Sequence, residues 1–196
     1  MEDKQLNADQ SLALIQQMIH QTRNKVERNA GMPFLLFGYA TVVTSIAVWY
    51  AVSTTQNYYW QFLWFILTGC TVGFWLYHRR HEHTKLVTTY VDRIIGYIWI
   101  VLSIAGFLQS MLAIFFLQIP ILYVITLLMG VGTALTGLVI HTRIVAWAGL
   151  FSALVLAPLC LVIKGIDAIL VFGAVFLVMM VIPGHVLNYR SNHPKQ

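Results

Sequence analysis

Histidines are the side chains of this sequence with the clearest capacity for chemistry. Three of them stand close together in the segment His78-Arg-Arg-His81-Glu-His83, and two more occur near the ends of later apolar segments. Imidazoles at positions i and i+3 share one face of a helix, and with a carboxylate they supply the nitrogen and oxygen ligands that zinc or iron takes. The candidate metal ligands are therefore His78, His81, His83, His141 and His185.

The same histidines have a second interpretation. Arginines lie inside the cluster, and their positive charge repels a metal cation. Histidines beside arginines at a membrane border are typically solvated, and the arginines reach the phosphates of lipid headgroups. Under this interpretation we expect no catalytic residue and no cofactor, and the residues that contact lipid headgroups are Arg79, Arg80, Arg143 and Arg190.

Individual residues also suggest a third function, which is transport along a substrate path across the membrane. Pro158 and Pro183 each lie inside an apolar segment, where proline removes one helical hydrogen bond and can expose backbone carbonyls to a substrate. Gln109 is a polar side chain in another such segment. Because these segments contain no Asp, Glu, Lys or Arg, the usual carriers of ion coupling are absent from them. The function that remains is a transporter or channel for a small, mostly apolar compound.

The distribution of charge identifies the elements that position these residues. Of 196 residues, 59% are hydrophobic and 10% charged, and Asp, Glu, Lys and Arg are absent from residues 30–78, 94–142, 144–163 and 168–189. A membrane-spanning helix needs about 20 mainly apolar residues, so two of these blocks are one span long and two are about twice that. Polar residues 53–57 and the turn at 118–120 divide the long blocks. We predict an all-α integral membrane protein, a bundle of six transmembrane helices near 33–52, 59–78, 94–117, 120–140, 144–163 and 167–187.

The basic residues predict the orientation of this bundle. If the N-terminus is inside, every Lys and Arg except Lys164 lies on the inner side. Such a bias in short loops favours both termini in the cytoplasm.

The first 31 residues are predicted to form a separate cytoplasmic element. Between residues 9 and 29, apolar residues such as Leu12, Ile15 and Ile19 recur at helical spacing, which indicates an amphipathic helix. Gly31 and Pro33 predict the end of this helix and the start of the first span. We expect the helix either to lie along the inner membrane surface or to dock a cytoplasmic partner. The predicted parts are residues 1–31, the six-span domain 32–190 and a tail at 191–196.

Glycines predict how the spans pack. The pattern Gly-x-x-aliphatic-x-x-Arg occurs at 73–79, 137–143 and 184–190, which suggests three helical hairpins in series, each glycine admitting a neighbouring backbone. Small residues also recur from Gly130 to Gly137, which favours close packing within the fold or between copies in a homo-oligomer.

The stretch from Ser11 to Arg23, followed by Phe34-Leu-Leu-Phe-Gly-Tyr39, resembles the opening of an uncharacterised family of small multi-span bacterial inner-membrane proteins. Proteins of that family pair an amphipathic N-terminal helix with a first span that begins FLL-aromatic-Gly-aromatic. The six-span plan is similar, more loosely, to the acid-resistance membrane proteins of enteric bacteria. These resemblances imply a bacterial cytoplasmic membrane, and they supply neither an activity nor a site residue.

The residues favour a small inner-membrane scaffold, sensor or stress-response component, without catalysis, that acts through a basic cytoplasmic rim. Its expected partners are anionic lipid headgroups and a cytoplasmic protein at the N-terminal helix. Nucleic acid is excluded because the basic residues are too dispersed. A transporter or channel is the alternative, and a metal-dependent membrane enzyme that uses the inner-face histidines is the third interpretation.

Overall fold

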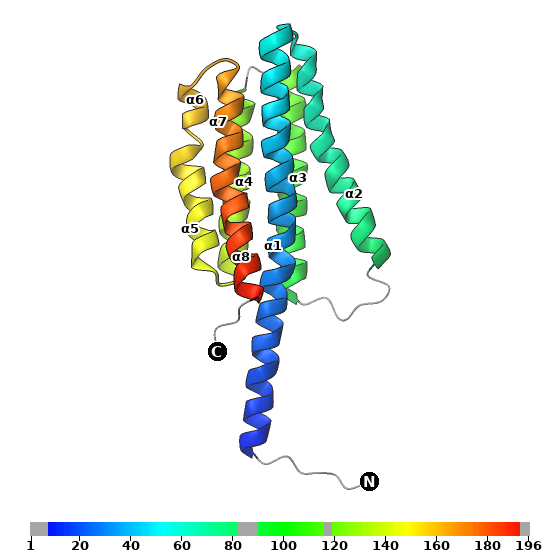
Figure 1. Cartoon of the computed structure of the whole chain (residues 1–196), viewed down its shortest axis with the longest axis vertical. Coiled ribbons are helices and arrows are strands. Elements are labelled where there is room, and N and C mark those ends of the chain that lie inside the picture. The colour runs from blue at the N-terminus through cyan, green and yellow to red at the C-terminus, as the bar shows by residue number, and fades with distance from the viewer. Residues whose placement is uncertain (1–7, 82–89, 116–118, 193–196) are drawn as a thin grey trace.

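The structure is a computed structural model that describes residues 8–81, 90–115 and 119–192, and throughout these ranges the chain is mainly helical. The helices lie side by side in an elongated bundle, and the first helix projects from one end of it (Figure 1). In chain order they are α1 (Ala8–Thr55), α2 (Phe65–His81), α3 (Tyr90–Phe115), α4 (Ile121–Val139), α5 (Arg143–Phe151), α6 (Leu159–Val162), α7 (Asp167–Phe176) and α8 (Ile182–Asn192). A 3₁₀ segment (Tyr58–Trp64) and two π-helical segments (Ser152–Leu156 and Leu177–Val181) connect some of them.

Five stretches are long and apolar enough to cross a membrane, which is the pattern of a helical membrane protein: Gly31–Thr55, Tyr90–Ala113, Ile121–Val139, Arg143–Val162 and Asp167–Arg190. They correspond to five of the six predicted spans. The predicted span at 59–78 is not one of them within the described residues, because it starts as a 3₁₀ segment and α2 itself has only 17 residues. The prediction of six spans is therefore not confirmed.

The predicted end of the first helix at Gly31 and Pro33 is wrong, because α1 continues through both residues as one helix of 48 residues. Gly31 is buried against α8, where an added Cβ would lie 3.2 Å from the Cβ of Leu187. Its lack of a side chain thus serves a close helix contact instead of a helix end. Pro33 removes one backbone donor and leaves α1 unbroken, as membrane helices allow.

The predicted polar loop at 53–57 is shorter than expected. The hydroxyl of Thr54 donates to the carbonyl of Tyr50 at 2.8 Å, and that of Thr55 donates to the carbonyl of Ala51 at 2.6 Å. These bonds return the polar side chains to their own helix, so α1 runs to Thr55. Gln56 then takes a positive φ of 53°, and Asn57 caps the 3₁₀ segment through the Tyr59 N–H.

The tightest contact in the bundle joins α4 to α5 and the π-helical segment after it. An added Cβ at Gly130 would lie 2.8 Å from the Cβ of Ala153, and one at Gly149 would lie 2.7 Å from the carbonyl oxygen of Gly130. Gly137 meets the backbone of Ala146 in the same way. The small residues predicted to mediate close packing therefore do so within the fold.

The predicted shared role of the three hairpin glycines holds for two of them. Gly137 meets α5, and Gly184 meets α1, where an added Cβ would lie 2.9 Å from the Cγ of Leu35. At Gly73 an added Cβ would meet no atom of the described structure within 4 Å. The prediction that each glycine admits a neighbouring backbone is therefore wrong at Gly73, because α2 diverges from the other helices toward its C-terminal end (Figure 1).

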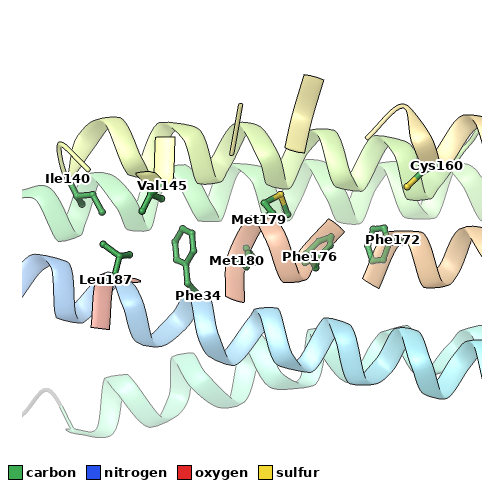
Figure 2. Packing of buried hydrophobic residues seen from close by; sticks show 9 residues of the cluster. All are labelled: Phe34, Ile140, Val145, Cys160, Phe172, Phe176, Met179, Met180 and Leu187. Atoms are coloured by element: carbon green, nitrogen blue, oxygen red, sulfur yellow. The ribbon is translucent and has the colours of Figure 1, made fainter. Parts of the chain in front are cut away.

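A row of apolar side chains lies in the interior of the bundle, contributed by α1, α5, α6, α7 and α8, by the residue after α4 and by the π-helical segment before α8 (Figure 2). Phe34 of α1 is 3% exposed and meets Trp99 of α3 edge to face, with ring centroids 5.9 Å apart. Phe172 packs in the same way against Trp64, at 5.3 Å. Each such edge-to-face pair adds about 0.5–1.5 kcal/mol beyond the burial of its rings.

Two prolines explain the two π-helical segments. The π-helical segments begin at Ser152 and at Leu177. In each case a proline, Pro158 or Pro183, follows six residues later. A proline cannot donate to the carbonyl four residues before it, and its ring clashes with that carbonyl. The wider turn relieves this clash, and in the first segment the Ala157 N–H donates to the Ser152 carbonyl at 2.8 Å.

These contacts predict that Gly149→Leu lowers the free energy of unfolding in detergent by about 2 kcal/mol or more, because the added side chain meets backbone that cannot move aside. Gly73→Leu is the matched control, since it also replaces a helical glycine but meets no described atom, and it should leave stability unchanged or slightly higher. Equilibrium unfolding of the purified variants measures both. Equal effects of the two substitutions would contradict the α4–α5 contact.

Candidate functional site

The candidate site is the basic end of the bundle, where α2, α4 and α8 finish and α3 and α5 begin (Figure 1). Arg93, Arg143 and Arg190 lie there with exposed side chains, and no ion pair to them is seen in the described part of the chain. Arg79 and Arg80 lie in the last turns of α2. Unpaired guanidinium groups at the end of a membrane bundle suit the phosphates of lipid headgroups.

His141 lies in the tight turn that joins α4 to α5. It has a φ of 55°, its N–H donates to the Leu138 carbonyl at 3.1 Å, and the Thr142 N–H donates to the Gly137 carbonyl at 2.8 Å. This pair of bonds is the Schellman motif, which satisfies the last carbonyls of a helix and normally has glycine at the left-handed position. His141 therefore holds a helix end, and its side chain is exposed.

His185 of α8 pairs with Tyr39 of α1. The Tyr39 hydroxyl and the Nε2 of His185 are hydrogen-bonded at 2.7 Å, and the two rings meet edge to face with centroids 5.9 Å apart. Both side chains are exposed on the outside of the bundle. The pair joins residues 146 positions apart and ties α1 to α8.

Of the five candidate metal ligands, the structure describes the side chains of His141 and His185 only. His83 lies outside the described residues, and for His78 and His81 only the backbone of α2 is described. In the part of the chain that the structure describes, no three His, Cys, Asp or Glu side chains are placed to hold a metal ion. The two described histidines thus have structural environments, one in a helix-ending turn and one beside a tyrosine.

The residues of the predicted substrate path are also distributed over separate parts of the bundle. Gln109 lies half-buried on α3, whereas Pro158 precedes α6, and these helices lie on opposite sides of the bundle in Figure 1. Pro183 is fully buried. Two buried hydroxyls, those of Thr133 and Ser152, have no partner in the described structure.

The opposite end of the bundle holds contacts that the sequence pattern did not reveal. The indole N–H of Trp49 on α1 donates to Asp167 Oδ1 at the start of α7, at 3.2 Å. The turn after α1 forms a shallow surface pocket of about 490 Å³, lined by Gln56, Asn57, Tyr58 and Tyr59. A carboxylate in the first turn is a recognisable signal of a helix start, because it interacts favourably with the positive end of the helix dipole. Its tryptophan partner could not be recognised, because it lies 118 residues away in the sequence.

Comparison with known protein families, with curated proteins and with solved structures finds no match to this chain.

The turn geometry makes a prediction that separates a structural role of His141 from metal binding. His141→Gly should leave stability unchanged or higher, because glycine takes a positive φ without a steric penalty. His141→Val should lower the free energy of unfolding by about 1–2 kcal/mol, because a β-branched residue resists this conformation. Unfolding curves of the two variants measure the effect. A loss of stability in His141→Gly that equals the loss in His141→Val would contradict this role.

Proposed function

We propose that this protein is a scaffold of a bacterial cytoplasmic membrane that acts through its basic end and the projecting part of α1. The observation that carries the proposal is the length of α1. Of its 48 residues, 25 form the candidate span Gly31–Thr55, which leaves 23 residues beyond it. At 1.5 Å per residue, this extension reaches about 34 Å from the bundle. A long helix outside the membrane is a surface for other macromolecules.

Six spans with both termini in the cytoplasm are part of this proposal. α1 and α3 run in the same direction along the bundle, so the chain must return between them, and α2 with the 3₁₀ segment before it makes that return (Figure 1). The seven 3₁₀ residues and the 17 residues of α2 together cover about 40 Å, at 2.0 and 1.5 Å per residue, enough for a hydrocarbon core of about 30 Å.

Charge supports the cytoplasmic assignment of the basic end. Arg93, Arg143 and Arg190 lie at this end, where α1 also projects, whereas Lys164 lies between α6 and α7 at the other end. An excess of Lys and Arg in short loops marks the cytoplasmic side of a membrane protein. Anionic lipids of the inner leaflet then attract this end, by about 1 kcal/mol for each basic residue near the surface.

The interior of the bundle supports a role without transport. The hydroxyls of Thr41, Ser45, Thr126 and Thr136 each donate to a carbonyl four residues earlier in the same helix, at 2.7–2.8 Å. These bonds use the single O–H donor of each side chain within its own helix, so none of the four offers a donor to a hydrated path. The row of apolar side chains in Figure 2, which includes Phe34, fills the centre of the bundle.

Site-specific photocrosslinking in intact cells tests this proposal. A photoreactive residue placed at Gln17 or at Asn24 should capture a defined cytoplasmic protein, the same one from both positions, because the projecting helix is the working surface. The matched control is the same residue at Tyr59, in the turn at the opposite end of the bundle, which should capture none. Adducts are identified by mass spectrometry. No adduct from either helix position, or the same adduct from Tyr59, would contradict the proposal.

A further inference from the structure

The projecting part of α1 carries a stricter pattern than general amphipathicity. A stripe of mostly apolar residues recurs along it at alternating intervals of four and three. The mean interval is 3.5 residues, which is the repeat of the seam in a left-handed coiled coil. In heptad notation the seam covers three heptads, with Leu12, Ile19 and Val26 at a and with Ala8, Ile15, Thr22 and Asn29 at d. Two of the three a positions have the β-branched residues that two-stranded parallel coiled coils favour there, although no d position has the leucine that accompanies them.

The bundle directs this helix away from itself. Gly31 is buried against α8, and Phe34 is buried against Trp99 of α3. Beyond these contacts α1 continues out of the end of the bundle (Figure 1). No other described helix lies beside the extension in Figure 1, and the side chain of Leu12 at position a is 58% exposed. Helices in proteins are stabilised mainly by packing of their apolar face, so the apolar residues of this extension favour a partner.

A second copy of the chain fits this seam because of how the membrane holds it. Two copies inserted with the same orientation present their extensions in parallel and in the same register, since both leave the bilayer at Gly31. In that arrangement the flanking g and e positions pair Ser11 with Gln16, Met18 with Arg23, and Lys25 with Ala30 of the other copy, so no like charges oppose each other. A flat position on the lipid surface would require a sharp bend near Gly31, whereas α1 continues through Gly31 and Pro33 as one helix.

We propose that residues 8–30 pair with the same residues of a second copy as a parallel two-stranded coiled coil. This inference rests on the proposed placement of the extension on one side of a membrane. Thr22 and Asn29 make the seam weak by themselves. Confinement of both copies to one membrane raises their effective concentration and offsets this weakness.

Disulfide crosslinking of the full-length protein in cell membranes tests the inference. In a background of Cys70→Ala and Cys160→Ala, single cysteines at a positions, Ile19→Cys and Val26→Cys, should give covalent dimers on oxidation. The matched controls at f positions, Gln17→Cys and Asn24→Cys, should give none, because their Cα atoms lie on opposite outer faces and a disulfide requires Cα atoms within about 7 Å.

A charge in the seam supplies the second measurement. Ile15→Asp combined with Val26→Cys should abolish the dimer, whereas Gln17→Asp combined with Val26→Cys should keep it. Unfolding of the bundle, which does not contain residue 15, shows that the variant is folded. Equal crosslinking at a and f positions, no dimer at any position, or a dimer that survives Ile15→Asp would overturn the inference.

The two proposals fail separately in these experiments. Capture of a cytoplasmic protein from Gln17 and Asn24 without a disulfide dimer would overturn the coiled coil and keep the scaffold function. A dimer through Ile19→Cys without any captured protein would support the coiled coil and contradict the scaffold function.

Discussion

Close approach of helix backbones at glycine is the interaction on which this bundle depends. Lipid is as apolar as leucine, so helices in a membrane gain little from burying apolar groups and are held by van der Waals packing and by hydrogen bonds between them. Gly130, Gly137 and Gly149 bring α4 and α5 together until backbone meets backbone. Gly38 and Gly184 do the same between α1 and the last two helical segments. The larger residues then fill what remains, with Phe34 and Phe172 meeting tryptophans edge to face.

The sequence predicted the spans well where a single physical requirement determines them. A charge inside hydrocarbon is costly, so charge-free blocks of the right length mark helices, and five of the six predicted spans correspond to helices that can cross a membrane. Helix ends were less predictable, because they depend on contacts from other parts of the chain. Gly31 has the local signature of a helix end, but α8 lies against it. At His141 the opposite occurs, since a helix ends at a residue that carries none of the usual signals.

The candidate site illustrates the same limit. Arginines at the end of the bundle could be predicted from charge alone, and three of them lie there with exposed side chains. The partners of His185 and Asp167 could not, because Tyr39 and Trp49 are more than a hundred residues away and no short motif joins them. Gly73 shows why a repeated pattern is insufficient evidence of a shared role. The residues of the pattern are local, whereas the neighbour that would meet the glycine is not, and at α2 it is missing from the described structure.

These constraints favour the proposed placement of recognition outside the bundle. Most of the glycines in α4, α5, α7 and α8 meet a neighbouring segment, and the hydroxyls of Thr126 and Thr136 are bonded to their own helix. Opening the interior to a ligand would remove the backbone contacts that hold the helices together. Inside a membrane, water is not present to replace these contacts. Both prolines that could have opened a helix are instead accommodated by wider turns, with Pro183 fully buried. The extension of α1 is free of these constraints. Gly31 packs against α8 at the basic end, and no described contact of the bundle involves the apolar residues of the extension. A surface that the fold does not use for itself is the surface available to a partner.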